Sequence, residues 1–211
     1  ALRRAGFREL LVVDDGSRDA TAARAREAGA RVLRLARNRG KGAALTAGLK
    51  ATSGDPILFL DADLGESAAA AVALLEPLAA GRAEMSVAAF PGPPRGAGLG
   101  WVVGLARWGI RRLTGWSPRF PVSGQRALRR SLAVRLTPFA PGFGVETVMT
   151  VRALWAGARV EEVPVPLRHR ATGRDLRGWL HRGRQWRDIA WALLRLALEA
   201  AVRQRPGEAR S

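Results

Sequence analysis

The stretch Ile57-Leu58-Phe59-Leu60-Asp61-Ala62-Asp63-Leu64 decides the fold that the sequence predicts. Four large apolar residues in a row are typical of a strand that is buried on both faces of a parallel sheet. Because strand side chains alternate, we expect Asp61 and Asp63 to point to the same side. Two carboxylates at the carboxyl end of a strand suit a hard divalent cation that also holds phosphate oxygens. The alternative is an acidic loop that caps the next helix.

Strand and helix patterns alternate on both sides of this stretch. Residues 9–13 and 31–35 are typical of strands, and 19–29 and 41–51 are predicted helices. This order predicts an α/β fold with a mostly parallel, doubly wound sheet flanked by helices. The elements predicted downstream are a helix at 68–80, a strand at 84–90, a loop at 91–100, a helix at 99–113, a short helix after 122–128, a helix at 143–155, an edge strand at 160–167 and a helix at 176–203.

Composition limits the classes of function. The chain of 211 residues has a formal net charge of +17 and no cysteine, which excludes disulfides and thiolate metal sites. The positive charge favours anionic partners such as phosphorylated substrates, an anionic membrane surface or nucleic acid. Nucleic acid is the least expected of these, because no zinc-finger, recognition-helix or RNA-binding aromatic motif is present. No apolar run has the length of a membrane span and no signal peptide is visible, so we expect a cytoplasmic protein.

Six short motifs occur in an order that resembles one enzyme family. They are Val-Val-Asp-Asp-Gly-Ser (12–17), Asn-Arg-Gly-Lys-Gly (38–42), Leu-Asp-Ala-Asp-Leu (60–64), Ser-Gly-Gln-Arg-Ala-Leu (123–128), Gly-Phe-Gly-Val-Glu (142–146) and Glu-Val-Pro-Val (162–165). Together they resemble the family-two glycosyltransferases with a GT-A fold. Within that family the sequence looks closest to the polyprenyl-phosphate sugar transferases, the dolichyl-phosphate mannose and glucose synthases. The family opens with a strand followed by Pro-x-Tyr-Asn-Glu, so the resemblance implies that a first strand is missing from these residues.

The resemblance implies how the donor is bound. Asp61 and Asp63 would hold Mg²⁺ or Mn²⁺, which bridges the diphosphate of a nucleotide-diphosphate sugar and stabilises the leaving group. Gly65 stands where the family often has a glutamine that assists the metal. For Asp15 the alternative is an ordinary turn residue, and for Lys41 it is a solvated first turn of a helix. The implied nucleotide-sugar-binding residues are Asp15, Gly16, Ser17, Lys41 and Asp61.

The acceptor side is also implied by the resemblance. Ser123 and Gly124 resemble the acceptor-side loop, although a plain tight turn is an alternative, and Phe120-Pro121-Val122 replaces the usual acid before them. Glu146 would act with Asp63 as a catalytic residue, either as a base or as an acceptor contact. Its alternative is a favourable interaction with a helix N-terminus. The residues expected to bind an acceptor phosphate are Ser123, Gly124, Arg168, Arg170 and Arg174.

The helices predicted at 99–113 and from 176 combine Trp with Arg, a composition that suits the headgroup region of a lipid bilayer. Simple packing against the sheet is the alternative. We therefore predict a glycosyltransferase domain at 1–175, a basic Trp-rich helix and tail at 176–211, and peripheral attachment to the inner face of a membrane. The predicted reaction moves a sugar to a polyprenyl phosphate with inversion. The alternatives are a soluble or glycan hydroxyl acceptor such as phosphoglycerate, or a non-catalytic nucleic-acid-binding protein.

Overall fold

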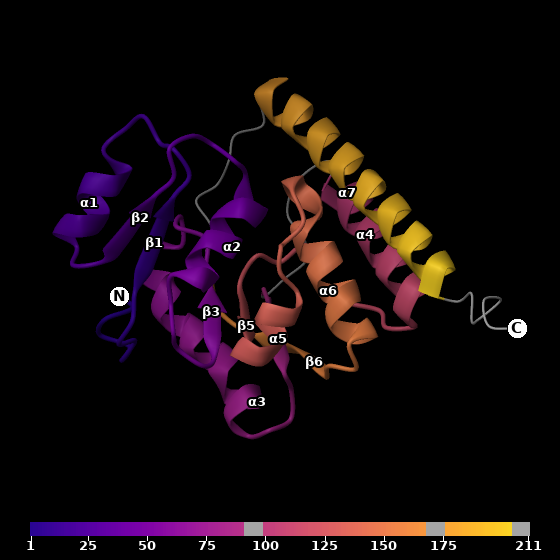
Figure 1. Ribbon diagram of the computed structural model, residues 1–211, viewed down its shortest axis with the longest axis horizontal. Coiled ribbons are helices and arrows are strands. Elements are labelled where there is room, and N and C mark those ends of the chain that lie inside the picture. The colour runs from indigo at the N-terminus through magenta and orange to yellow at the C-terminus, as the bar shows by residue number, and fades with distance from the viewer. Residues whose placement is uncertain (91–98, 168–175, 204–211) are drawn as a thin grey trace, which may run out of the picture.

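The computed structural model describes residues 1–90, 99–167 and 176–203. Its strands form two sheets (Figure 1). In the smaller sheet, β1 (Leu11–Asp14) pairs in parallel with β2 (Arg31–Arg34). Figure 1 shows this pair at one end of the molecule, with α1 (Thr21–Glu27) beside it and α2 (Lys41–Lys50) leading back toward the larger sheet. The strand–helix alternation predicted for residues 9–51 is therefore confirmed.

The larger sheet has the strand order β3-β5-β4-β6. Its strands are β3 (Ile57–Phe59), β4 (Met85–Ala89), β5 (Arg126–Leu128) and β6 (Val160–Pro164). Strand β5 runs antiparallel to both β3 and β4, while β6 runs parallel to β4. Three of the four strands therefore share one direction, and β6 takes the edge position predicted from the two prolines of residues 160–167.

Both faces of the larger sheet are buried, as the apolar stretch predicted. Ile57 and Phe59 belong to one core cluster together with Leu128. Leu58 packs against a second cluster, which includes Ala127 of β5. Neighbouring residues of one strand thus enter opposite cores, because strand side chains alternate between the two faces. The helical segments that surround this sheet are η1 (Gly65–Leu75), α3 (Glu76–Ala79), α4 (Leu99–Thr114), α5 (Arg130–Arg135), η2 (Gly142–Gly144), α6 (Val145–Trp155) and α7 (Leu176–Arg203).

Helices α4 and α7 lie side by side at the opposite end of the molecule from α1 (Figure 1). With α6 they build a third core cluster that includes Ile110, Val151 and Leu193. A side chain at Gly109 would collide with Leu193, so α4 and α7 approach closely at this point. The division of the chain at 175/176 stays a prediction, although α7 shares this core. Within the described ranges, no helix has the length and apolar content needed to cross a membrane.

Two predicted elements need correction, and one strand was not predicted. Strand β3 ends at Phe59, so Asp61 and Asp63 lie in the turn that follows it and the alternation argument does not apply to them. Strand β5 at 126–128 was not predicted, because its pairing partners β3 and β4 are distant in sequence, whereas α5 matches the short helix predicted after 122–128. The helix predicted at 68–80 is a 3₁₀ segment up to Leu75, and a new α-helix begins at Glu76. Pro77 lies in the first turn of that helix, where its missing N–H removes no helical hydrogen bond.

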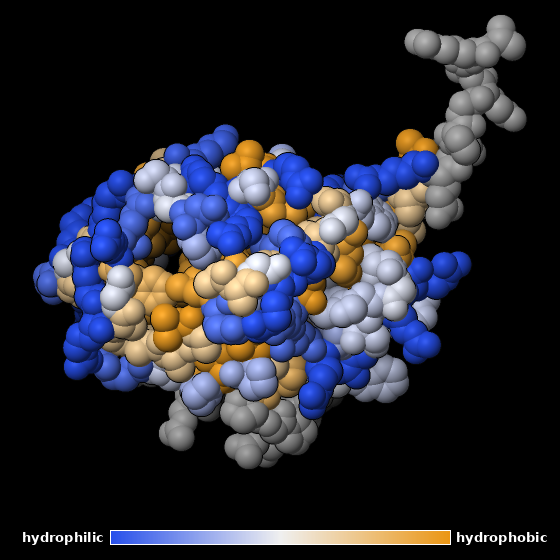
Figure 2. Space-filling model, turned by 90° about the horizontal axis from the view of Figure 1, so that it is seen from below, coloured by the Kyte–Doolittle hydropathy of each residue, from blue (hydrophilic) through white to orange (hydrophobic). Residues whose placement is uncertain are grey.

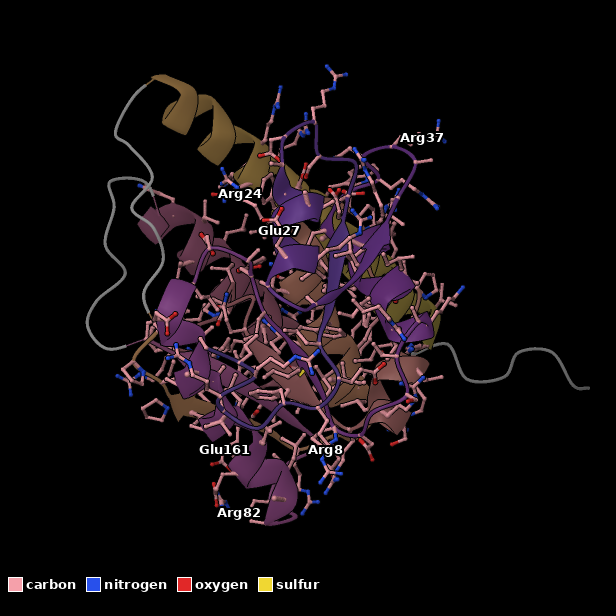
Figure 3. All side chains as sticks on the ribbon, turned by 90° about the vertical axis from the view of Figure 1, so that its left-hand side faces the viewer. Arg8, Arg24, Glu27, Arg37, Arg82 and Glu161 are labelled. Carbon is pink, nitrogen blue, oxygen red and sulfur yellow. The ribbon has the colours of Figure 1, made fainter. Side chains whose placement is uncertain are left out.

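The face of the molecule seen in Figure 2 is largely hydrophilic, with hydrophobic side chains in a smaller area between them. Some of the charged surface side chains form ion pairs with each other. Arg82, for example, pairs with Glu76 and with Glu161 of β6, and Figure 3 shows Arg82 and Glu161 near the same end of the molecule. Pairs as exposed as these contribute little to stability.

Candidate active site

Three residues predicted from separate motifs meet beyond the end of β3. The Lys41 ammonium lies 2.7 Å from Asp61 Oδ1 and 2.8 Å from Glu146 Oε1. Lys41 is the first residue of α2, Asp61 follows β3, and Glu146 lies in the first turn of α6. The Glu146 side chain is nearly buried, whereas those of Lys41 and Asp61 are about one-third exposed. The site therefore holds a compact acid–base–acid group with access to solvent.

Lys41 keeps its positive charge in this group. Burial alone would lower the pKa of Lys41, but the carboxylates of Glu146 and Asp61 outweigh that effect and raise the pKa above its ordinary value. Hydrogen bonds to the same two carboxylates act in the same direction. The ammonium is consequently protonated throughout the neutral range and neutralises part of the negative charge of the acid pair.

The predicted acceptor-side loop closes over this group. A Cβ at Gly124 would lie 2.6 Å from Lys41 Nζ and 2.7 Å from Asp61 Oδ2, so a larger residue there would displace the charged ends of these two side chains. Gln125 Nε2 donates a hydrogen bond of 2.6 Å to Asp61 Oδ2. Ser123 Oγ donates in turn to Gln125 Oε1 at 3.4 Å. Gln125 was quoted in a motif but not predicted as a site residue, and its contact with Asp61 makes it one.

Arg126 is a second residue that sequence reasoning missed. Its side chain is only 1% exposed. Its guanidinium donates to the carbonyl of Ser123 at 2.8 Å and to Thr150 Oγ1 at 2.7 Å, and Thr150 Oγ1 donates to the carbonyl of Glu146. Burial lowers the pKa of Arg126 to about 10, and Glu146 and Glu162 offset part of that effect, so Arg126 is charged at neutral pH. One buried cation thus joins the acceptor-side loop to the start of α6.

The predicted nucleotide side lies at the carboxyl end of β1. The Asp15 carboxylate accepts hydrogen bonds from the backbone N–H groups of Arg39 (2.8 Å) and Gly40 (2.7 Å), and so fixes the loop that leads to Lys41. Gly16 has φ +80°, and a Cβ there would lie 2.8 Å from Asn38 N. Figure 3 shows Arg37 on the same loop, at the edge of the molecule. An open hollow of about 600 Å³ is lined here by Gly16, Ser17, Arg18, Arg34, Leu35 and Ala36.

Asp14, which was not predicted as a site residue, stabilises the turn at Gly16 and Ser17. It is buried, and Asp14 Oδ1 accepts a hydrogen bond of 2.8 Å from the Ser17 N–H. Hydrogen bonds from Ser17 hold the pKa of Asp14 below its ordinary value. The Arg34 Nε lies 3.3 Å from the other carboxylate oxygen. Buried polar residues at the end of an apolar strand were the signal that could have identified Asp14.

The donor atoms around Asp61 fit a divalent cation. Carboxylate oxygens are the ligands that Mg²⁺ and Mn²⁺ prefer, and an ammonium already lies against Asp61 Oδ1. Asp63, two residues further along the turn, is exposed. No group of three acidic or histidine side chains suited to a metal occurs in the described part of the chain. A cation here would therefore complete its coordination with oxygens of a bound ligand or water. The predicted residues Arg168, Arg170 and Arg174 lie outside the described residues.

This fold is the GT-A fold of nucleotide-sugar transferases. Residues 2–142 match the family model for glycosyl transferase family 2, and the chain belongs to that family. Both statements confirm predictions made from the six motifs. All of the predicted donor-side residues, including Asp15, Lys41 and Asp61, lie within the matched range.

Several known proteins are similar to this chain. The glucosyl-3-phosphoglycerate synthase of Mycobacterium tuberculosis is 36% identical over 161 residues, which are 65% of this chain and 49% of that protein. Glycosyltransferase AglJ of Haloferax volcanii is 32% identical over 178 residues, which are 81% of this chain and 57% of that protein. The chain thus spans about half the length of these curated relatives. They leave the polyprenyl-phosphate subtype unconfirmed.

Solved structures of a similar enzyme contain ligands. The glucosyl-3-phosphoglycerate synthase of Mycobacterium tuberculosis, in complex with Mn²⁺, uridine-diphosphate-glucose and phosphoglyceric acid, superposes with a TM-score of 0.72. The match has 32% sequence identity and covers 90% of this chain and 69% of that chain. Another structure of the same enzyme holds Mg²⁺ and uridine diphosphate.

Proposed function

We propose that this chain carries the donor site and catalytic centre of a metal-dependent glycosyltransferase, which moves a sugar from a nucleotide-diphosphate sugar to a phosphorylated acceptor. The observation that supports this most is the Lys41–Asp61–Glu146 group at the end of β3, with Gly124 packed against it. It assembles residues from four separate motifs at the sheet edge where α/β proteins bind ligands. Family membership and the Mn²⁺ and uridine-diphosphate-glucose complex of a relative agree with it.

On this proposal, Asp61 and Asp63 hold Mg²⁺ or Mn²⁺, which supplies positive charge to the departing nucleoside diphosphate. Asp15 positions the loop before α2 through two backbone N–H groups. Gly16 and Ser17 line the hollow that receives the nucleoside. Lys41 follows the hollow-lining residues in the sequence and contacts Asp61. Because it lies at the start of a helix, its ammonium can meet diphosphate oxygens.

Glu146 is the residue proposed to handle the acceptor proton. A hydroxyl acceptor must lose a proton as its oxygen bonds to the sugar carbon and the carbon–oxygen bond to the diphosphate breaks. Glu146 is nearly buried and fixed through Lys41, and its main-chain carbonyl is held by Thr150. Glu146 also lies in the first turn of α6, where a negative charge interacts favourably with the helix N-terminus. The proposed catalytic role and this helix interaction are therefore compatible.

For the acceptor, the comparisons favour the hydroxyl alternative over polyprenyl phosphate. The solved relatives include complexes with phosphoglyceric acid, a small molecule with both a phosphate and a hydroxyl. We therefore place a small phosphorylated hydroxyl acceptor first. Ser123 and Gly124 border its proposed site, and Arg168, Arg170 and Arg174 remain the proposed phosphate ligands.

A lipid-linked phosphate acceptor is the second candidate, because α4 and α7 expose aromatic side chains to solvent. Trp101 is 81% exposed and Trp108 63% exposed on α4, and Trp186 and Trp191 are exposed on α7. Arginines lie on the same two helices, as at Arg112. Exposed Trp with Arg suits the headgroup region of an anionic bilayer. This candidate places the protein peripherally at the inner face of a membrane.

The test is a transfer assay on the full-length protein with Mn²⁺, a panel of radiolabelled nucleotide sugars, and two acceptors offered separately. We expect label to move to phosphoglycerate and not to polyprenyl phosphate. Transfer only to the lipid would reverse the order of the two candidates. Absence of transfer from every donor, together with salt-sensitive binding to nucleic acid, would favour a non-catalytic protein instead. The anomeric configuration of the product reports whether the displacement inverts.

A further inference from the structure

Lys41 occupies an unfavourable position for a cation. It is the first residue of α2, where the unpaired N–H groups of a helix repel positive charge. The other lysine of the chain, Lys50, lies in the last turn of the same helix, where positive charge is favourable. Local helix electrostatics therefore do not explain Lys41, and the two carboxylates that it contacts do.

The backbone around Lys41 has little room to move. A side chain at Gly42 would collide with the carbonyl of Ala140, so the start of α2 packs directly on that loop. On the other side, a Cβ at Gly124 would meet the Lys41 ammonium itself. Any change in the position of the charge must come from rotation of the Lys41 side chain.

Asp61 is restricted in a different way. Its Oδ2 accepts a hydrogen bond from the buried amide of Gln125, whereas its Oδ1 contacts only the Lys41 ammonium among the described contacts. A divalent cation that binds Asp61 therefore competes with Lys41 for Oδ1. An ammonium and a divalent cation in contact with the same carboxylate oxygen repel each other strongly, because they are only a few ångströms apart.

We propose that Lys41 is an internal counter-cation for the Asp61–Glu146 pair, which releases Asp61 Oδ1 when a divalent cation binds and keeps its contact with Glu146. Gln125 holds Asp61 in place during this exchange. The exchange frees one ammonium hydrogen-bond donor for the donor diphosphate at the moment that the metal arrives. The inference rests on the proposed function and adds an order of binding, in which the metal binds first and so prepares Lys41 for the diphosphate.

The test compares Lys41→Met with Lys50→Met, a matched control on the exposed end of the same helix, in the full-length protein. Mn²⁺ binding without nucleotide is measured from the electron paramagnetic resonance signal of free Mn²⁺, and thermal unfolding is followed with and without Mn²⁺. Lys41→Met should bind Mn²⁺ roughly fivefold more tightly than the unmodified protein, since a competing cation is gone. Without metal it should unfold at a lower temperature. Lys50→Met should change neither quantity.

The proposed role predicts that Lys41→Met raises the Mn²⁺ affinity and lowers the stability. A merely structural role would lower both. Equal or weaker Mn²⁺ binding by Lys41→Met would overturn the inference, as would absence of Mn²⁺ binding to the unmodified protein. If Lys41→Met does not fold, Lys41→Gln keeps a polar side chain of similar length without the charge. Uridine diphosphate titrated with Mn²⁺ present tests the proposed function separately. Absence of nucleotide binding would reject that function even where the lysine variants behave as expected.

Discussion

The group around Asp61 and the outer face of α4 and α7 differ in how far their side chains are held by contacts within the chain. In the first, each charged or amide side chain has a partner inside the chain, as Lys41 has in Asp61 and Glu146. In the second, Trp101 and Trp108 extend into solvent, although the inner faces of the same helices are buried. Internal ion pairs hold the side chains of the first region in place, whereas the indole rings of the second region lie mostly in solvent. Changes in the first region should therefore affect stability and binding together.

The largest effect on stability is expected from Arg126→Met. Removing this guanidinium leaves the carbonyl of Ser123 and the hydroxyl of Thr150 without a buried donor. We expect a loss of about 3 kcal/mol in the free energy of unfolding. Urea denaturation measures it, with Arg135→Met as control, because Arg135 is exposed at the end of α5. Equal stability of the two variants would show that the acceptor-side loop is held by other contacts.

Trp155→Ala should have a smaller effect and sharpens the contrast with the exposed tryptophans. The Trp155 indole donates to the carbonyl of Leu113, and Arg203 stacks over its ring at 4.8 Å. Because the ring joins α6 to the ends of α4 and α7, we expect a cost of about 2 kcal/mol in unfolding free energy. Trp101→Ala should change it by less than about 0.5 kcal/mol. Similar losses in both variants would mean that Trp101 is packed in solution.

The smallest expected effect is the pH dependence that Lys41 contributes. Its pKa is raised in the folded chain from an ordinary value of 10.5. A raised lysine pKa contributes stability that is fully present below about pH 10.5 and is lost as the pH rises through the folded pKa. The stability difference between the unmodified protein and Lys41→Met should thus shrink between about pH 9 and about pH 12, by no more than about 1 kcal/mol. Denaturation at the two pH values measures it, and a difference that grows would contradict the assignment.

The sequence predicted those site residues that belong to a short local motif and also have a side chain suited to the chemistry. Asp61, Lys41 and Glu146 come from separate motifs, and the structure brings all three together. Gln125 and Arg126 were missed because β5 is only three residues long and gains its strand conformation from β3 and β4, which are distant in sequence. A buried arginine also hides the apolar pattern that a sheet strand usually shows. The end of β3 at Phe59 likewise depends on tertiary contacts and not on the apolar run alone.

The glycines show a similar limit. Gly124 was predicted as an acceptor-side residue, and a larger residue there would displace the side chains of Lys41 and Asp61. Gly109, in contrast, lies inside the helix predicted at 99–113, and its close approach to Leu193 becomes visible only when α4 and α7 pack. The sequence places an element, but contacts between distant elements decide which small residues are essential.

Metal-dependent nucleotide binding by the two aspartates is the most direct test of the central claim. Calorimetric titration of uridine diphosphate into the full-length protein, with and without Mn²⁺, measures it. We expect Mn²⁺ to increase the affinity of the unmodified protein, and Asp63→Asn and Asp61→Asn to remove that increase, on the order of 100-fold for one lost charged contact. Asp63→Asn should leave the free energy of unfolding nearly unchanged, because Asp63 is exposed. The same Mn²⁺-dependent affinity in both variants and in the unmodified protein would contradict a metal site at the end of β3.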